Sequence, residues 1–313
     1  MDKLRTAVIG VGGAGGNIVS SIYDDFGTRS GDATFSILNT DVQALESLVE
    51  KKRFNSEFNH QIGQRTTNGL GAGSVPEMGE AAAKEDIALV RSIVQDKDLI
   101  MVVAGLGGGT GSGAIPILLY EAKKAGALTI CWSVIPFEYE GPKRNKIAKQ
   151  ALKQVDEMAD SYIVISNDVV DDVVFKDAMD HINITISNGI ETMLQVLLEP
   201  SLINLDFADF TTVLKGGGRC VFSYASFDGQ DRPKRVSDEL LKFSLQPSLS
   251  TRKIRQSVIF VRGGTDMRKD EIQIVSSSIQ KKLNEDALML LGVSVTEEKQ
   301  SLDAVFFGTV EEK

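Results

Sequence analysis

Apolar runs alternate with amphipathic stretches through the first half of the chain. The apolar, partly β-branched runs predict buried strands at 6–9, 34–38, 98–104, 128–135 and 162–165. Apolar residues at helical spacing predict helices near 18–26, 42–49, 78–93, 114–122 and 145–159, with Pro116 in the first turn of its helix. Strands that alternate with helices predict an α/β fold with a right-handed, mainly parallel sheet covered on both faces.

The second half of the chain has a different order of elements. A long helical pattern runs from about Lys176 to Leu198 and ends at Pro200. A short acidic turn, Asn204–Phe210, follows it, and Gly216–Gly218 marks a break in composition. The pattern beyond the break predicts strands at 220–227, 257–262, 287–295 and 302–310 and helices at 237–243 and 271–283. This half is therefore expected to form a smaller α/β unit.

Three glycine-rich turns, Gly10–Asn17, Gly69–Glu77 and Ala104–Gly113, each precede a predicted helix. Free backbone N–H groups and the positive end of a helix dipole meet at such a turn, and glycine lets an anion approach the backbone. Thr110 and Ser112 add hydroxyl donors to the last turn. This turn predicts a phosphate cradle, and the buried strand and apolar helix around it disfavour a flexible linker. Because parallel strands end at one edge of a sheet, ligands are expected at that edge.

The first glycine-rich turn leaves a second kind of ligand open. Gly10, Gly12 and Gly15 fit the dinucleotide pattern G-x-G-x-x-G, which alone is a weak signal. A dinucleotide site needs an acid after the next strand to hold the ribose, and Asp41 could serve. Asp41 could equally cap the helix predicted at 42–49. An NAD(P)-dependent oxidoreductase therefore stays as the alternative function.

The composition restricts the kinds of partner and the cellular compartment that we expect for this chain. The formal net charge of −9 argues against nucleic acid and anionic membranes as direct partners, since both attract basic surfaces. Cys131 and Cys220 lie in separate apolar runs without metal-site spacing, so we expect buried free thiols in a reducing cytoplasm. The 2 histidines are too few for a His-based metal site. No apolar run is long enough to insert into a membrane, and the N-terminus leads directly into a strand, which predicts no signal peptide.

These motifs together resemble the tubulin/FtsZ superfamily, and most closely FtsZ, the prokaryotic cell-division GTPase. The resemblance covers nearly the whole chain, and the phosphate-loop motif is its most specific part. Gly107–Gly113 resembles the phosphate loop. The first, second and third nucleotide loops resemble Gly10–Asn17, Asn39–Leu45 and Gly69–Glu77, respectively. Pro136–Arg144 resembles the ribose loop, and Asn204–Asp209 fits the N-x-D-x-x-D synergy loop.

The resemblance implies a GTPase that assembles head to tail. Each GTP site would be completed by the acidic loop of the next subunit, and such a heterologous interface builds filaments. GTP or GDP and Mg²⁺ are the implied cofactors, the chain itself is the implied partner, and no adaptor is identified. The implied domains are a Rossmann-like GTP-binding domain at 1–175, a connecting helix at 176–203 and a GTPase-activating domain at 204–313.

The resemblance also implies roles for individual residues. Asn204, Asp206 and Asp209 are the implied catalytic residues, which orient or polarise the attacking water, although the turn alone would suit an ordinary capping Asp. No side chain is assigned as a metal ligand. The implied nucleotide-binding residues are Gly12, Gly13, Ala14, Gly15, Asn17, Asn39, Asp41, Gly71, Ala72, Gly73, Gly105, Gly107, Gly108, Gly109, Thr110, Gly111, Pro136, Glu140, Arg144, Asn167, Met179 and Asn183.

Several positions depart from the family pattern. Met179 and Asn183 stand where FtsZ has a base-packing Phe and a guanine-reading Asp, although an Asn amide still bonds guanine and a Met side chain still covers the base. The linker and tail peptide of FtsZ do not follow Lys313, as expected of a divergent member or a trimmed chain. A nucleotide-binding protein that assembles but hydrolyses poorly is a further alternative. The other departures are Asn68, Val75, Ile135 and Pro142.

Overall fold

The computed structural model describes residues 4–24, 33–50, 55–169, 175–199, 201–242, 246, 254–297 and 300–310. Internal contacts divide the chain into two compact units, which we name unit 1 (Met1–Ser187) and unit 2 (Asn188–Lys313). Helix α8 (Phe175–Leu198) begins in unit 1 and ends in unit 2. The three-part division expected from the sequence stays a prediction.

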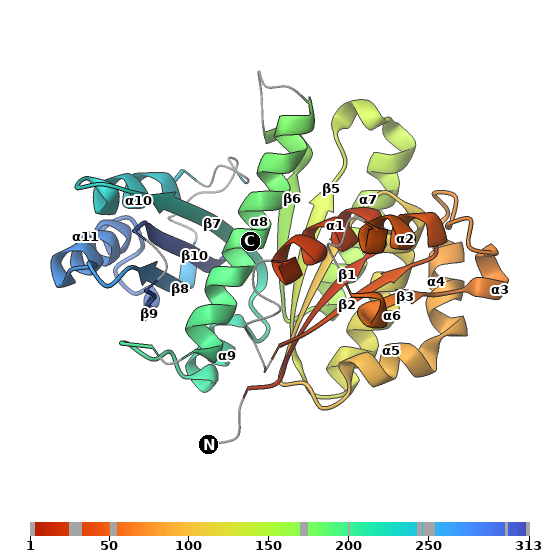
Figure 1. Ribbon diagram of the computed structural model, residues 1–313, viewed down its shortest axis with the longest axis horizontal. Coiled ribbons are helices and arrows are strands. Elements are labelled where there is room, and N and C mark those ends of the chain that lie inside the picture. Colours follow the sequence, from red (N-terminus) through yellow and green to blue (C-terminus); the bar gives the residue numbers. More distant parts are fainter. Residues whose placement is uncertain are drawn as a thin grey trace. The chain divides into compact units, whose positions relative to one another are not determined.

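Unit 1 is built on a parallel sheet (Figure 1). Its strands follow the order β3-β2-β1-β4-β5-β6, and all neighbours are parallel, which confirms the predicted α/β fold with a mainly parallel sheet. The strands are β1 (Thr6–Val11), β2 (Ala33–Asn39), β3 (Asn59–Gln61), β4 (Leu99–Gly105), β5 (Leu128–Ile135) and β6 (Ser161–Ser166). Besides α8, the helices are α1 (Gly12–Ile22), α2 (Val42–Glu50), α3 (Gln64–Thr67), α4 (Pro76–Glu85), α5 (Ile87–Val94), α6 (Gly109–Lys124) and α7 (Pro142–Met158), with short 3-10 turns at Ser56–Phe58, Glu138–Glu140 and Asn167–Val169.

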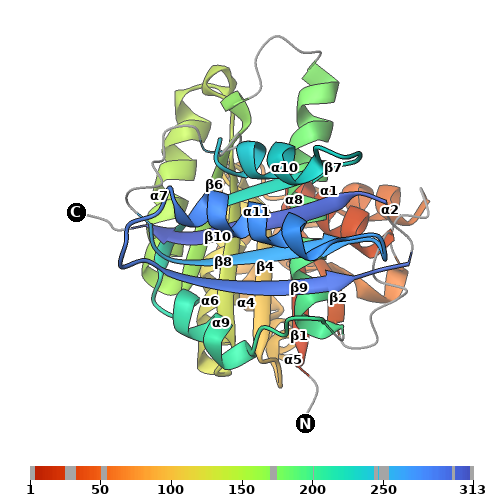
Figure 2. The same ribbon diagram turned by 90° about the vertical axis from the view of Figure 1, so that its left-hand side faces the viewer.

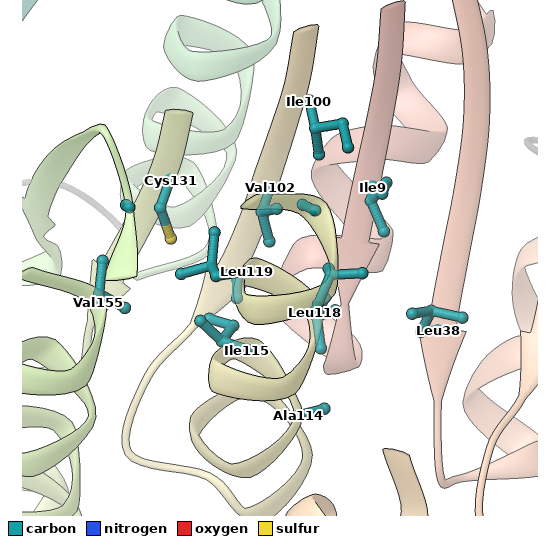
Figure 3. Packing of buried hydrophobic residues seen from close by; sticks show 14 of the residues in the cluster. Ile9, Leu38, Ile100, Val102, Ala114, Ile115, Leu118, Leu119, Cys131 and Val155 are labelled. Carbon is teal, nitrogen blue, oxygen red and sulfur yellow. The ribbon is translucent and has the colours of Figure 1, made fainter. Parts of the chain in front are cut away.

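Helices cover both faces of this sheet because alternate strand residues point to opposite sides. Val102 and Cys131 are register neighbours that point to one face, where they share a hydrophobic cluster with Leu119 of α6 (Figure 3). Helices α4, α5 and α7 contribute to the same cluster. On the other face α1 packs on β2 so closely that a Cβ on Gly16 would lie 3.2 Å from Cγ2 of Ile37. Burial on both faces explains why these strands are almost wholly apolar.

The parallel strands of unit 1 end at one edge of the sheet. Val11 at the end of β1 is level with Ala104 of β4, and Gly105 is level with Val134 of β5. The glycine-rich turns after β1 and β4 therefore lie side by side, as the sequence predicts.

Unit 2 contains a smaller mixed sheet (Figure 2). Its strands follow the order β7-β10-β8-β9, with β10 antiparallel to β7 and β8, and β8 parallel to β9. Helices α10 and α11 pack on one face. On the other face Phe210 of α9 meets Phe260 of β8 edge-on, with ring centroids 5.9 Å apart. The elements are β7 (Gly218–Phe227), β8 (Ile254–Gly263), β9 (Leu288–Val295), β10 (Leu302–Val310), α9 (Phe207–Leu214), α10 (Arg232–Leu240) and α11 (Lys269–Gln280).

Helix α6 begins earlier than predicted, at Gly109 instead of Ala114. Pro116 therefore lies inside the helix, and the prediction that placed it in the first turn was wrong. The glycines of the first turns are helical because they pack against α4: a Cβ on Gly113 would lie 2.0 Å from the carbonyl oxygen of Pro76. Close packing thus overrides both the low helix propensity of glycine and the backbone donor that Pro116 lacks.

Two other helix predictions were wrong. The helix predicted at 78–93 is divided at Asp86 into α4 and α5. Asp86 leaves the helical angles, with φ −104° and ψ 33°, and its carboxylate accepts a 2.6 Å hydrogen bond from the N–H of Gly63. The acidic turn after α8 contains a helix, α9, whose apolar face the sequence analysis missed. The buried residues of that face are Phe210, Val213 and Leu214.

The residues expected in the interior are buried. Cys131 and Cys220 are buried thiols outside any disulfide, which confirms the prediction of buried thiols. Burial raises the pKa of Cys131 to about 12. Trp132 of β5 is fully buried as well. Within the described ranges, none of the helices combines the length and the apolar character needed to cross a bilayer.

Candidate functional site

Helix α1 begins at the carboxyl end of β1 without a side-chain cap. Val11 precedes the helix in an extended conformation, with φ −118° and ψ 122°, and offers no side-chain acceptor. Gly12 then adopts a φ of +72°, a backbone conformation in which a residue with a side chain would be strained. The first N–H groups of α1 are therefore available to an anion.

Helix α6 begins in the same way after β4. Gly108 precedes it, extended at φ −94° and ψ 178°, without a side-chain cap. A Cβ on Gly108 would meet no heavy atom within 4 Å, so the space beside it is open. Gly107 donates its N–H to Oγ of Ser112 at 2.9 Å, which fixes the turn from within. A fixed turn in front of an open helix N-terminus is suited to hold a phosphate.

Backbone contacts interlock these two uncapped helix starts. A Cβ on Gly15 of α1 would lie 2.1 Å from the carbonyl oxygen of Val103, and one on Gly111 of α6 would lie 2.2 Å from that of Gly105. A Cβ on Gly12 would lie 3.3 Å from the nitrogen of Gly111. Side chains at these positions would separate the segments. The glycines thus hold the positive ends of two helix dipoles together at the sheet edge.

The third glycine-rich turn packs on the start of α6. Ala72 is buried, and a Cβ on Gly109 would lie 2.6 Å from its Cβ. Gly79 of α4 approaches the same point, since a Cβ there would lie 2.2 Å from the carbonyl oxygen of Gly109. Gly71 and Gly73 flank Ala72 with φ values of +81° and +56°. The structure therefore brings predicted residues 71–73 beside the phosphate turn.

Asn39 is the last residue of β2, and Asp41 lies in the segment that follows it. Oδ1 of Asp41 accepts a 3.2 Å hydrogen bond from the N–H of Ala44, so Asp41 caps α2, the second of the two roles that the sequence left open. Asn39 is buried, and its Oδ1 accepts the N–H of Asp41 at 3.3 Å. Both side chains are held in place by local hydrogen bonds.

The loop after β5 holds the predicted ribose residues. Glu140 forms an ion pair of 2.5 Å with Arg144, and its Oε1 also accepts the N–H of Phe137 at 2.9 Å. Tyr139 stacks on Phe137 with ring centroids 4.8 Å apart, yet 69% of Tyr139 is exposed. Partial desolvation of the hydroxyl, together with the negative charges of Glu140 and Asp168, raises the pKa of Tyr139.

An unsatisfied acceptor follows β6. Asn167 is only 6% exposed, and its Oδ1 has no hydrogen-bond partner in the described part of the chain. Buried polar atoms are normally paired, so this oxygen is a candidate to accept a ligand N–H group. Met179 and Asn183 of α8 are half-buried. Ser187, one turn further along α8, donates its hydroxyl to the carbonyl oxygen of Ile18 at 3.3 Å, which packs this part of α8 against α1.

The predicted catalytic residues Asn204, Asp206 and Asp209 lie in unit 2. Oδ1 of Asp206 accepts the N–H of Ala208 at 3.0 Å, so this carboxylate caps α9. Asp209 is exposed in the first turn of α9. Asn204 is exposed as well, and its Oδ1 accepts the N–H of Ser201 at 3.2 Å. Among the described residues no group of three or more His, Cys, Asp or Glu side chains is arranged to hold a metal ion.

Comparison with known proteins identifies the family. The family model "Tubulin/FtsZ family, GTPase domain" matches residues 5–174. The chain belongs to the tubulin/FtsZ family. The chain is 33% identical to the cell division protein FtsZ of Aquifex aeolicus over 305 residues, which cover 96% of this chain and 81% of that protein. It is 35% identical to a cell division protein FtsZ of Archaeoglobus fulgidus, again over 96% of this chain and 81% of the relative.

Solved structures of the tubulin/FtsZ family have the same fold. An FtsZ dimer of M. jannaschii matches with a TM-score of 0.89 and 29% identity, over 98% of this chain and 88% of that one. CetZ of Methanosaeta thermophila matches in fold, with a TM-score of 0.83 at 21% identity, over 99% of this chain and 87% of that one. The resemblance to the tubulin/FtsZ superfamily is therefore confirmed. Gly10, Gly12 and Gly15 accordingly lie in a GTPase domain, which disfavours the dinucleotide alternative.

Two residues of this tubulin/FtsZ-family site were not predicted. Thr40 lies within the second loop motif, but its hydroxyl contact with Thr110 joins positions 70 residues apart and has no signal in the sequence. Gly79 interrupts the polar and apolar pattern of α4, and a glycine inside a predicted helix was a usable signal for a close backbone approach.

Proposed function

We propose that this chain binds and hydrolyses GTP and assembles head to tail into filaments. One observation carries the proposal: two uncapped helix starts, α1 and α6, are interlocked at the carboxyl edge of a parallel sheet, inside a domain of a GTPase family. Phosphoryl transfer depends mainly on positioning and charge stabilisation, which backbone N–H groups and helix dipoles supply.

The residues around this edge suit a guanine nucleotide. Backbone N–H groups at Gly12–Gly15 and Gly107–Gly111 would hold the phosphates. The buried Oδ1 of Asn167 would accept a guanine N–H group, since it has no partner within the described residues. Asn183 and Met179 would bond and cover the base. Mg²⁺ binds mainly to phosphate oxygens and water, so this proposal needs no cluster of protein carboxylates.

Hydrolysis would need a second copy of the chain. Asp206 and Asp209 would meet the nucleotide of the next subunit, with Asn204 beside them. Asp206 caps α9 with Oδ1, which leaves Oδ2 for water. Asp209 is exposed and would orient or polarise the attacking water. A heterologous contact of this kind repeats and produces a filament.

Sedimentation combined with phosphate release tests the proposal. GTP, GDP and ATP are compared across protein concentrations. We expect GTP to support sedimentation and phosphate release per subunit to rise above a threshold concentration, because each site then gains a neighbour. Release per subunit that stays constant from low to high concentration would contradict assembly-dependent hydrolysis.

Other outcomes separate the parts of the proposal. Sedimentation with GTP but without phosphate release would indicate a nucleotide-binding protein that assembles and hydrolyses poorly. Equal activity with ATP would contradict the guanine contacts proposed for Asn167 and Asn183. The relatives are named cell division proteins, and we propose a division or related cytoskeletal role for this chain. Labelled chain that stays away from division sites in cells would contradict the division role alone.

A further inference from the structure

Thr40 connects two of the nucleotide turns through its side chain. It follows β2 directly and is fully buried, and its Oγ1 lies 2.7 Å from Oγ1 of Thr110. Thr110 is the second residue of α6, so this contact reaches the uncapped start of that helix. A buried hydroxyl therefore lies directly behind a side chain of the phosphate turn.

The backbone of Thr40 holds a third segment. Its carbonyl oxygen accepts a hydrogen bond from the N–H of Gly71 at 3.2 Å. The same oxygen lies 3.2 Å from Oγ1 of Thr67, whose single proton is shared with the closer carbonyl oxygen of Gly63 at 2.9 Å. Asp41, the next residue, forms an isolated antiparallel bridge with Leu70. Thr40 thus joins the phosphate turn to the segment that leads into the third glycine-rich turn.

The chemistry of the two hydroxyls gives this contact a direction. Each hydroxyl has one proton to donate and lone pairs that accept. If a phosphate oxygen takes the proton of Thr110, Oγ1 of Thr110 can only accept within the pair. Thr40 must then donate to it, and within the described residues no other acceptor contacts the Thr40 hydroxyl. A bound phosphate would therefore fix the orientation of both hydroxyls.

We propose that Thr40 is a positioning residue for the nucleotide phosphate. It orients the hydroxyl of Thr110 toward a phosphate oxygen, and through its carbonyl it couples occupation of the phosphate turn to the segment from Thr67 to Gly71. The inference rests on the proposed function, because its ligand is the phosphate of a bound nucleotide.

Two substitutions at one position test the role of the hydroxyl. Thr40→Val removes the hydroxyl and keeps the branched shape, whereas Thr40→Ser keeps the hydroxyl. Affinity for a fluorescent, slowly hydrolysed GTP analogue is measured by anisotropy, together with Tm in the absence of nucleotide. We expect Thr40→Val to weaken binding about fivefold, the effect of one hydrogen bond, and Thr40→Ser to bind like the unmodified chain. Equal affinity of Thr40→Val and the unmodified chain would overturn the proposal, as would Thr40→Ser binding as weakly as Thr40→Val.

A double substitution separates positioning from general packing. In a Thr110→Val background, Thr40→Val should cause no further loss of affinity, because its effect acts through the hydroxyl of Thr110. A second loss of about fivefold in that background would show that Thr40 acts through the shape of the core, and would overturn the proposal. An unmodified chain that binds no GTP analogue would contradict the proposed function itself, which is a different result.

Hydrogen exchange tests the coupling without any change at Thr40. At saturating nucleotide, exchange of the Gly71 N–H should slow in the unmodified chain, because this group donates to Thr40. The slowing should be lost in Thr110→Val. Equal slowing in both chains would overturn the coupling, even if Thr40→Val failed to fold.

Discussion

Helices α1 and α6 of unit 1 start without a side-chain cap, whereas helix α9 of unit 2 starts on the carboxylate of Asp206. Val11 and Gly108 precede the two unit 1 helices and offer no side-chain acceptor. In α9 the N–H of Ala208 donates to Asp206. First-turn N–H groups are thus left for a ligand in unit 1 and partly satisfied within the chain in unit 2.

The difference shows two ways of placing charge on one chain. In unit 1 the positive potential comes from backbone groups, and neither helix has an acidic side chain in its first turn. In unit 2 the start of α9 presents two exposed carboxylates, Asp206 and Asp209. In the proposed function, unit 1 would bind the phosphates and the carboxylates of unit 2 of a second copy would act on the attacking water. The proposed head-to-tail assembly requires this complementarity.

The largest expected effect comes from breaking the interlock of the uncapped helix starts. Gly15→Ala would force a Cβ to within 2.1 Å of the Val103 carbonyl oxygen, so we expect a loss of about 3 kcal/mol in the free energy of unfolding and a loss of nucleotide binding. Gly13→Ala is the matched control, because a Cβ there meets no heavy atom within 4 Å. It should change the free energy of unfolding by less than about 1 kcal/mol, measured by urea unfolding without nucleotide. Similar losses in both variants would contradict the interlock.

A smaller effect separates the two roles of Asp206. Asp206→Asn keeps a good helix cap and removes the charge, whereas Asp206→Ala removes both, so only the Ala variant should lose about 1 kcal/mol of stability. Both variants should lose hydrolysis and keep nucleotide binding, because in the proposed function the carboxylate acts on the attacking water and does not contact the base. Asp209→Ala should also lose hydrolysis without loss of the cap. Hydrolysis that survives in Asp206→Asn and in Asp209→Ala would contradict the catalytic assignment.

The smallest effect concerns α3, whose N–H groups at Arg65 and Thr66 donate to the Glu85 carboxylate of α4. Hydrogen bonds from the hydroxyl of Thr66 and from the N–H of Arg65 lower the pKa of Glu85 from about 4.5 to about 2. A depressed pKa adds stability that is present above the ordinary value and is lost as the pH falls toward the lowered one. The urea midpoint is measured by circular dichroism at each pH. We therefore expect the fall in this midpoint between about pH 5 and about pH 2 to be smaller in Glu85→Gln than in the unmodified chain. Glu80→Gln, which removes only an exposed pair with Lys84, should leave that fall unchanged.

The strands and their common edge could be predicted because buried parallel strands are almost wholly apolar. The strand predicted at 302–310 has the same bounds as β10, and that at 128–135 the same as β5. The acidic turn could have been assigned to a helix, because Phe210, Val213 and Leu214 already have helical spacing. The interpretation of this turn as one with an ordinary capping Asp was the better indication of its local structure, since Asp206 caps α9.

The remaining features depend on contacts between distant parts of the chain. The glycines before Ala114 have low helix propensity, and they are helical because α4 packs on them, which no local pattern shows. The break at Asp86 is accompanied by its hydrogen bond to Gly63, 23 residues away. The contact of Thr40 with Thr110 likewise joins residues that only the folded sheet edge brings together.

The burial of Trp132 gives the molecule a built-in optical label. This residue is the chain's 1 tryptophan and lies fully buried in β5, so its emission reports on unit 1 alone. Exposure to water on unfolding would shift that emission to longer wavelength, while circular dichroism sums the helices and strands of both units. Two unfolding curves recorded on the same sample would therefore resolve whether the units melt together, without any added dye.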